Sequence, residues 1–504
     1  MPAPMPHRRI LTIAALAVFA SLPLQAQAWP GRDRLEPETC RPLQGEGAAW
    51  LERAAQATGL ATLASPLRFT ASESDAQFFQ SDRMYPPYIG STTALEYTFD
   101  PASGAERGRV LLPGGGKGRD LILTPRALLV VRDSALVAVA GGYRFFASSR
   151  ALNPLAVLAD WRGTPAVVEA RCRFRDYPRV VLSHGVPGER LYLDEKTGVP
   201  VKFERMEPHV LWGQVRAEYV YTTWTERASV ILPVVAVRHI DGVEQLRRDL
   251  ALPQARNEVL ARLVTAAEAW PAALPAPLPD HTSAPDVSRR EMPVDTVRVD
   301  ARTVLLRTPM YTHAVTQVGD TVYLFDATTA EWRSRADSAW IARLFPTHKA
   351  VALVVTDLAW PHISGVRYWA ARGATIITHR LSQPMLRQVL ERRWTLEPDL
   401  LETIRARAGR PRWLLVDSTA TLAGGALRLG AIDGVASEGA LYAMLPGAGF
   451  LWAGDYIQTT DAPSLYAREV MAAVRRAGFT PERVAAQHLP LSSWTQVTSA
   501  NPPS

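Results

Sequence analysis

Residues 351–379 read VALVVTDLAWPHISGVRYWAARGATIITH and decide the fold of the second half of the chain. The apolar run 351–355 is bounded by Thr356 and Asp357, and apolar or aromatic residues then recur at helical spacing across residues 363–370. This pattern predicts a buried strand that delivers the loop 357–362 onto the start of a helix. Loops at the carboxyl end of such a strand are held by a rigid sheet yet stay open to ligands, so we expect functional residues there.

Thr356, His362 and Gly365 follow one another at a spacing that resembles the signature loop of the metallo-β-lactamase fold superfamily. In its metal-binding form that loop reads Thr-His-x-His-x-Asp-His and leads into a glycine-containing helix. The resemblance implies an α+β fold in which a C-terminal αββα sandwich carries metal ligands on its loops. It also implies a metal-dependent hydrolase that acts on a small molecule.

Three positions of the signature loop lack the usual ligand. Asp357 stands where the first histidine is expected, Ala359 where the second is expected, and Pro361 where the aspartate is expected. In a loop at residues 435–439 that matches Gly-His-[Thr/Ser]-x-Gly, Ala436 stands where a further histidine is expected. The first of the family's two metal ions would need the positions of Asp357, Ala359 and Ala436, and two of these have no donor atom, so the resemblance implies that its site is lost. Pro361 stands at a position of the second ion.

The ligands of the second ion are largely retained. Asp455 matches the bridging aspartate, and His488 matches the final histidine. The resemblance implies a degenerate centre that holds at most one zinc ion on His362, Asp455 and His488, with Asp357 as a further candidate ligand. Asp357, His362 and Asp455 are the implied catalytic residues. Two histidines and a carboxylate suit Zn²⁺ or Fe²⁺, although a polar cluster without a metal is the open alternative.

The other histidines are weaker candidates. His379 ends a predicted strand at the same edge, so it is a candidate hydrogen-bond partner for the ligands. The remaining histidines of the mature chain are predicted to be surface or turn residues: His184, His209, His239, His281, His313 and His348.

The N-terminus predicts export. Arg8 and Arg9 precede an apolar segment at residues 10–24, and Ala-Gln-Ala at residues 26–28 is typical of a cleavage site. We expect residues 1–28 to be a signal peptide that is cut after Ala28, which predicts a periplasmic or secreted protein. Later apolar runs are too short to span a membrane, so we expect no transmembrane span.

Charge gives little support for a nucleic-acid partner. The chain has 56 basic and 49 acidic residues, and two of the arginines fall in the predicted signal peptide. The remaining excess is small, and arginines are interspersed with acids rather than clustered. We therefore expect no nucleic-acid binding.

The two cysteines, Cys40 and Cys172, belong to no Cys-x-x-Cys motif or Cys/His cluster, which argues against a cysteine metal site. An oxidising compartment would permit them to pair, and the sequence leaves open whether they form a disulfide.

A proline-rich stretch divides the chain. Six prolines occur between Pro271 and Pro293 among Ala, Ser, Asp and Thr, without a helical or strand period. We predict a linker at residues 268–295 between a domain at residues 29–267 and a second domain at residues 296–504.

The first domain is predicted to be an antiparallel sheet with a helix at residues 47–60. The segments LYLDEKTGVPVKFER at 191–205 and WGQVRAEYVYTTW at 212–224 resemble the curved half-barrels of periplasmic lipoprotein carriers. That resemblance implies an apolar concave face able to contact an acyl chain or lipoprotein segment, or else a spacer domain. The predicted strands are 95–99, 109–112, 121–123, 127–132, 180–183, 190–194, 200–204, 215–221 and 230–237.

The second domain is predicted to alternate strands and helices in two successive halves, as the αββα sandwich does. We expect helices at 334–345, 385–408 and 464–477. The expected strands are 303–307, 314–318, 321–326, 351–355, 375–378, 413–416, 426–429, 441–445, 450–453 and 484–486.

The sequence leaves two classes of function open. One is a weak, single-metal hydrolase of the metallo-β-lactamase superfamily, or its inactive descendant. The other is a non-catalytic periplasmic protein that binds a small molecule, an acyl chain or a lipoprotein.

Overall fold

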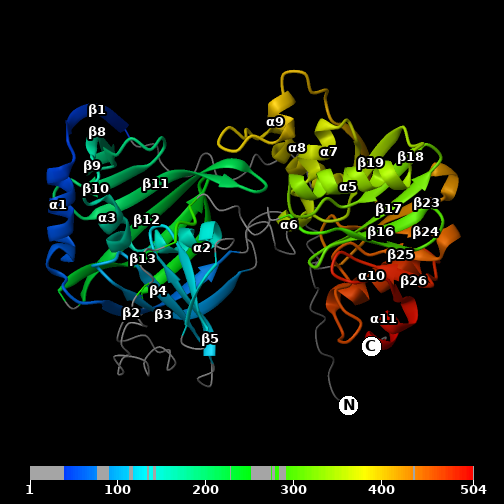
Figure 1. Cartoon of the computed structure of the whole chain (residues 1–504), viewed down its shortest axis with the longest axis horizontal. Coiled ribbons are helices and arrows are strands. Elements are labelled where there is room, and N and C mark those ends of the chain that lie inside the picture. The colour runs from blue at the N-terminus through cyan, green and yellow to red at the C-terminus, as the bar shows by residue number, and fades with distance from the viewer. Residues whose placement is uncertain are drawn as a thin grey trace, which may run out of the picture.

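The computed structural model describes residues 39–76, 90–112, 117–132, 135–139, 143–227, 229–250, 274, 279–282, 291–434 and 437–502. The predicted signal peptide at residues 1–28 and Ala436 lie outside these ranges. The fold of these ranges is mixed α and β, and their strands form three sheets (Figure 1). Within the described ranges, no helix is long and apolar enough to cross a membrane.

The first sheet is large and antiparallel throughout, with strand order β1-β8-β9-β10-β11-β12-β13-β14-β2-β3-β4-β5-β6-β7. Every strand predicted between residues 95 and 237 corresponds to one of its strands. Its members are β1 (Thr39–Glu46), β2 (Leu67–Asp75), β3 (Ser91–Phe99), β4 (Glu106–Leu111), β5 (Lys117–Leu123), β6 (Leu128–Arg132), β7 (Ala135–Ala138), β8 (Val167–Phe174), β9 (Tyr177–Ser183), β10 (Arg190–Asp194), β11 (Pro200–His209), β12 (Gly213–Arg227), β13 (Val230–Ile240) and β14 (Val243–Leu250).

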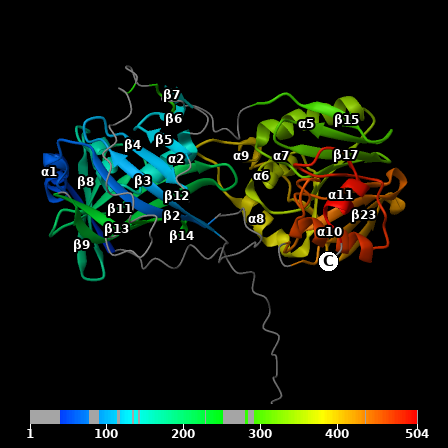
Figure 2. The same ribbon diagram turned by 90° about the horizontal axis from the view of Figure 1, so that it is seen from below.

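Helices cover one face of this sheet. Besides α2 (Tyr143–Arg150), the helices α1 (Ala48–Ala57) and α3 (Pro154–Trp161) place Leu51 and Leu155 in one apolar cluster with Val180 and Leu191 of the sheet. Alternate residues of the same strands, such as Val181, belong to a separate cluster on the opposite face. The period of two in the strands therefore decides which face receives the helices. Figures 1 and 2 show α1, α2 and α3 beside the strands of this sheet.

Cys40 and Cys172 are joined in a disulfide between β1 and β8, where the two residues face each other in register. The structure thus answers the question that the sequence left open. Strand β1 is exposed along its whole length, so burial contributes little to holding it. The disulfide, which closes a separation of 132 residues, is the covalent tie of this strand to the sheet.

We expect loss of this disulfide to lower the free energy of unfolding by roughly 2–4 kcal/mol, because the cross-link restricts the unfolded chain. Urea denaturation of the oxidised protein and of the Cys40→Ser/Cys172→Ser variant measures the difference. A reductant should shift the midpoint of the parent protein and leave that of the double variant unchanged. Equal midpoints for the two proteins would contradict the prediction.

The second half of the chain forms two further sheets. In the first, β15 to β18 are antiparallel neighbours and β18 to β21 are parallel neighbours, in sequence order. These strands are β15 (Asp295–Arg298), β16 (Thr303–Arg307), β17 (Thr312–Val318), β18 (Thr321–Phe325), β19 (Ala350–Val355), β20 (Thr375–His379) and β21 (Arg412–Val416). The other sheet contains β22 (Thr419–Leu422), β23 (Leu427–Ala431), β24 (Leu441–Leu445), β25 (Phe450–Trp452), β26 (Arg483–Ala485) and β27 (Ser492–Ser493).

Three apolar clusters show how these sheets pack. Phe325 and Val354 of one sheet share a cluster with Leu441 and Trp452 of the other. A second cluster joins the outer side of the sheet β15–β21 to α5 (Glu331–Leu344), α7 (Val366–Ala371) and α8 (Gln383–Glu391). A third joins the other sheet to α10 (Leu465–Arg476) and α11 (Trp494–Ala500). Both sheets are therefore buried on two sides.

The prediction of one long helix at residues 385–408 is wrong. Helix α8 ends at Glu391, and α9 (Leu400–Ile404) begins a separate turn. Pro398 disfavours helical backbone at the residue before it, and the Asp399 side chain caps α9 by accepting a hydrogen bond from the Glu402 N–H. The intervening segment instead contacts the β11–β12 hairpin, where Arg392 donates to the Trp212 carbonyl at 2.9 Å.

Part of the proline-rich stretch also contacts the first sheet. Leu274 packs beside Ile122 and Leu129, and His281 Nδ1 accepts a hydrogen bond from the Leu128 N–H at 3.2 Å. The prediction that His281 is a surface or turn residue is wrong, because its side chain is buried in this contact.

Candidate metal centre

The candidate centre lies where β18 and β19 end. These strands are parallel, so their carboxyl ends lie at one edge of the sheet. Asp326 follows β18 with φ of 65°, a conformation that aspartate tolerates better than most residues. It accepts hydrogen bonds from the Thr356 N–H at 2.8 Å and from Trp452 Nε1 at 3.0 Å. Asp326 thereby ties the start of the signature loop to β25.

His362 enters the centre from α6 (Trp360–Ile363). Pro361 sits in the first turn of this helix, where its missing N–H costs nothing. The imidazole is buried, and its Nδ1 lies 2.7 Å from Asp357 Oδ1. An ionised carboxylate can only accept, so Nδ1–H donates and Nε2 remains for another partner.

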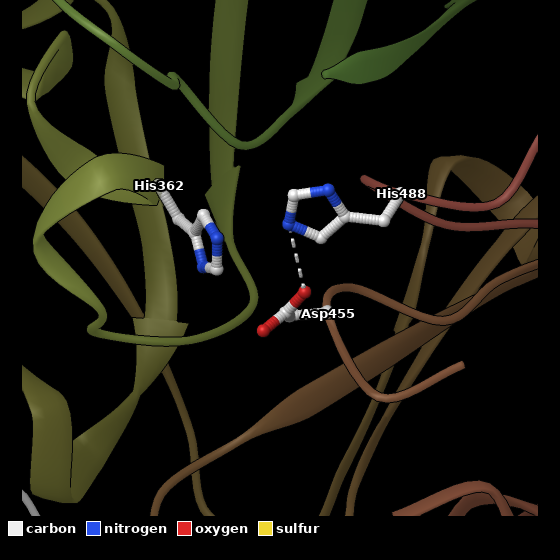
Figure 3. A group of neighbouring side chains, drawn as sticks. All are labelled: His362, Asp455 and His488. Carbon is white, nitrogen blue, oxygen red and sulfur yellow. Dashed lines mark ion pairs between the residues drawn. The ribbon is translucent and has the colours of Figure 1, made fainter. Parts of the chain in front are cut away.

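Asp455 and His488 enter from the other sheet. Asp455 follows β25 through Gly454, which has φ of 59°, and a Cβ there would lie 2.6 Å from Thr356 Oγ1. The site therefore requires glycine at position 454. His488 follows β26, and its Nε2 lies 3.4 Å from Asp455 Oδ1. Figure 3 shows His362, Asp455 and His488 converging from three separate segments.

The three side chains form a group that could hold one metal ion. Each offers one ligand atom, and these atoms all lie within 4.8 Å of one another. Two ligand atoms on a tetrahedral zinc ion are separated by about 3.3 Å, close to the His488–Asp455 distance of 3.4 Å. Two histidines and one carboxylate leave a further position open, as catalytic zinc sites require.

The charges at the centre also favour a cation. Burial raises the pKa of Asp455 to about 7, with His362 opposing and Asp357 reinforcing the shift. Burial and the charge of Asp357 raise the pKa of Asp326 to about 6. Burial alone would lower the pKa of His362, but Asp357 and Asp455 outweigh it and raise that pKa to about 9. Several carboxylates thus share a poorly solvated site, where added positive charge is stabilising.

We expect zinc affinity to increase with pH. To hold a zinc ion, His362, whose pKa is about 9, would have to lose a proton, and below pH 7 Asp455, whose pKa is about 7, would have to lose a second. The dissociation constant should fall roughly tenfold per pH unit between these two pKa values and roughly a hundredfold per unit below them. Competition with a chelator of known proton affinity measures the slopes. An affinity that is constant from acidic to alkaline pH would contradict this assignment of protons.

The other positions that the sequence analysis compared with family ligands do not join His362, Asp455 and His488 in the centre. Ala359 and Pro361 have no donor atom in their side chains, and Ala436 lies outside the described residues. Both Asp357 oxygens accept hydrogen bonds, from His362 and from Gln487 Nε2 at 3.1 Å. Asp357 is therefore adjacent to the centre, but it is not among the three side chains grouped around one point.

His379 lies in a different place. Its Nε2 is 2.9 Å from the Asp417 carbonyl, and its ring lines a cavity of about 730 Å³ together with Tyr442 and Arg476. None of His362, Asp455 or His488 lines that cavity. The candidate metal centre is therefore identified by the donor atoms of its three side chains, and it does not coincide with this cavity.

Sequence reasoning misses three neighbours of the centre. Asp326 and Gln487 hold the ligand loops, and the Tyr311 ring packs 4.9 Å from the His488 ring and 5.9 Å from the His362 ring. Burial and the nearby carboxylates raise the pKa of Tyr311 to about 12, so its phenol stays protonated at neutral pH. Of these three neighbours, only Gln487 could have been suggested by the sequence, because it directly precedes the candidate ligand His488.

The prediction that His313 is a surface or turn residue is wrong. Its side chain is fully buried, with Nδ1 at 2.6 Å from Asp337 Oδ2 and Nε2 accepting from the Thr328 N–H at 3.0 Å. Burial lowers the pKa of His313, with Asp337 opposing the shift. The ring is therefore a neutral imidazole that donates through Nδ1 and accepts through Nε2.

No family model and no curated protein matches the chain. Among solved structures, the chain is similar to the DIM-1 metallo-β-lactamase, with 13% identity, 42% of this chain and 96% of that chain covered, and a TM-score of 0.33. It is also similar to a metallo-β-lactamase from Erythrobacter litoralis, with 17% identity, 42% and 96% covered, and a TM-score of 0.33. These TM-scores indicate a limited likeness, so a function is proposed from the residues and contacts of this chain.

Proposed function

We propose that the protein is an exported, single-metal hydrolase whose C-terminal half has the metallo-β-lactamase fold. The observation that carries this proposal is the convergence of His362, Asp455 and His488, whose ligand atoms lie within 4.8 Å of one another. A zinc ion held there would supply Lewis acidity and lower the pKa of a water molecule.

The proposed αββα arrangement is supported by the three apolar clusters, one between the two sheets and one beneath the helices on each outer side. Export through a signal peptide at residues 1–28 is supported by the disulfide, since such bonds persist in oxidising compartments. The proposed domains, residues 29–267 and 296–504, are supported by the sheets, because β1–β14 end at Leu250 and β15 starts at Asp295.

The chain's own groups have distinct tasks at this centre. Asp357 and Gln487 hold the ligand loops in place, and the Tyr311 ring restricts the orientation of both imidazoles. The protonated Tyr311 phenol is able to donate a hydrogen bond to negative charge that develops on a substrate. Activity should be weak, because Ala359 provides no donor for a second ion and Pro361 cannot supply the carboxylate expected at the remaining one.

A non-catalytic binding protein is the second candidate, and the missing donors at Ala359 and Pro361 favour it. Acyl-chain binding has less support. Helices α1 and α3 occupy the apolar face of the first sheet, and the cavity beside Phe69 and Leu232 on that face has about 20 Å³, room for about one water molecule. A hollow of about 760 Å³ lies on the opposite face, but charged residues such as Arg190, Lys202 and Glu218 line it.

Metal analysis tests the proposal. We expect one zinc ion per chain in the unmodified protein and a large loss of zinc in His488→Ala. We also expect hydrolysis of chromogenic esters or lactones at least about 100-fold slower than by an intact two-metal relative, because a major electrostatic stabiliser is lost. Two tightly bound ions, or zinc binding that is indifferent to His488, would overturn the assignment. Zinc binding without turnover of any substrate would favour the non-catalytic candidate.

A further inference from the structure

Asp357 is buried, and both of its carboxylate oxygens accept hydrogen bonds. Oδ1 accepts from His362 Nδ1 at 2.7 Å and from the Ala359 N–H at 2.9 Å, while Oδ2 accepts from Gln487 Nε2 at 3.1 Å. Ligation of a metal by Oδ1 would compete with its two bonds, and Asp357 is not among the side chains whose ligand atoms converge on one point. Each buried donor left unpaired would cost about 1–3 kcal/mol.

We propose that Asp357 is a positioning residue that orients His362 toward the metal, rather than a metal ligand itself. This inference rests on the proposed function. The hydrogen bond from Nδ1 leaves Nε2 of His362 as the ligand atom and restricts rotation of the ring. Histidine ligands commonly donate their other N–H to a carboxylate in this way.

Gln487 extends this arrangement to the other ligands. Its N–H donates to the Gly454 carbonyl at 2.8 Å, next to Asp455, and its carbonyl accepts from the Thr312 N–H at 2.7 Å, next to Tyr311. Its side chain donates to Asp357, and His488 follows it in the chain. One buried residue therefore links the segments that carry all three ligands.

The test compares cobalt binding by Asp357→Asn and Asp357→Ala with that by Asp417→Asn. Asp417 follows β21 at the same sheet edge, but its side chain is exposed and pairs with Arg380. The visible absorption of bound Co²⁺ reports the number and kind of its ligands. Near-ultraviolet circular dichroism checks that each variant is folded.

We expect Asp357→Asn to bind one Co²⁺ about 10- to 100-fold more weakly with unchanged absorption bands. Asparagine retains an oxygen that can accept from His362, so Asp357→Ala should bind more weakly than Asp357→Asn. Asp417→Asn should bind as the unmodified protein does. If the alanine variant fails to fold, the asparagine variant alone decides the question.

Two results would overturn the inference and leave the proposed function intact. One is unchanged affinity in Asp357→Asn. The other is a loss as complete as in His362→Ala with altered absorption bands, which would make Asp357 a ligand. Failure of the unmodified protein to bind Co²⁺ or Zn²⁺ would instead overturn the proposed function, and this inference with it.

Discussion

Replacing Asp337 with alanine should lower the free energy of unfolding by about 3–5 kcal/mol, because it leaves the buried charge of Arg333 without its carboxylate partner. Arg333 and Asp337 are both fully buried, and Arg333 Nε lies 2.9 Å from Asp337 Oδ1. Burial opposes ionisation of Asp337, but Arg333 and His313 keep its pKa below the usual value. Urea denaturation measures the loss.

The surface pair Lys349–Asp320 provides a matched control, because both side chains are largely exposed. Asp320→Ala should change the free energy of unfolding by no more than about 0.5 kcal/mol. Replacing Arg333 and Asp337 together with apolar residues should cost less than Asp337→Ala alone, since no charge is then left buried. Equal stability of Asp337→Ala and Asp320→Ala would refute the role assigned to this pair.

Replacing His362 with alanine should weaken zinc binding by more than about 100-fold. Loss of a residue that merely orients a ligand costs about 10- to 100-fold, and His362 is one of three proposed ligands. Calorimetric titration with zinc, together with metal analysis after dialysis, measures the change. His379→Ala is the matched control, because His379 ends the adjacent strand but lines a separate cavity.

The control should retain the zinc affinity of the unmodified protein. Equal losses in His362→Ala and His379→Ala would show that zinc binds elsewhere or that binding depends on general stability. If the His362→Ala variant hydrolysed substrate as fast as the unmodified protein, the activity would not depend on this centre.

Much of the secondary structure follows from local patterns. The apolar run at residues 351–355 corresponds to β19, and residues 190–194 are the whole of β10. Strand β1 escapes prediction, because its residues are exposed and lack an apolar alternation. The break between α8 and α9 depends on a cap at Asp399 and on contacts with Trp212, which come from a distant part of the chain.

The sequence by itself determined which residues can ligate a metal. The side chains of Ala359 and Pro361 have no donor atom in any fold, whereas those of His362, Asp455 and His488 do. The ability to ligate a metal ion depends on the chemistry of each side chain, which the sequence specifies directly. Only the tertiary structure decided that the three retained donors meet at one point and that Asp357 instead accepts from His362 and Gln487. The reason is that these residues are far apart in the chain, so their distances depend on how the two sheets pack rather than on local spacing.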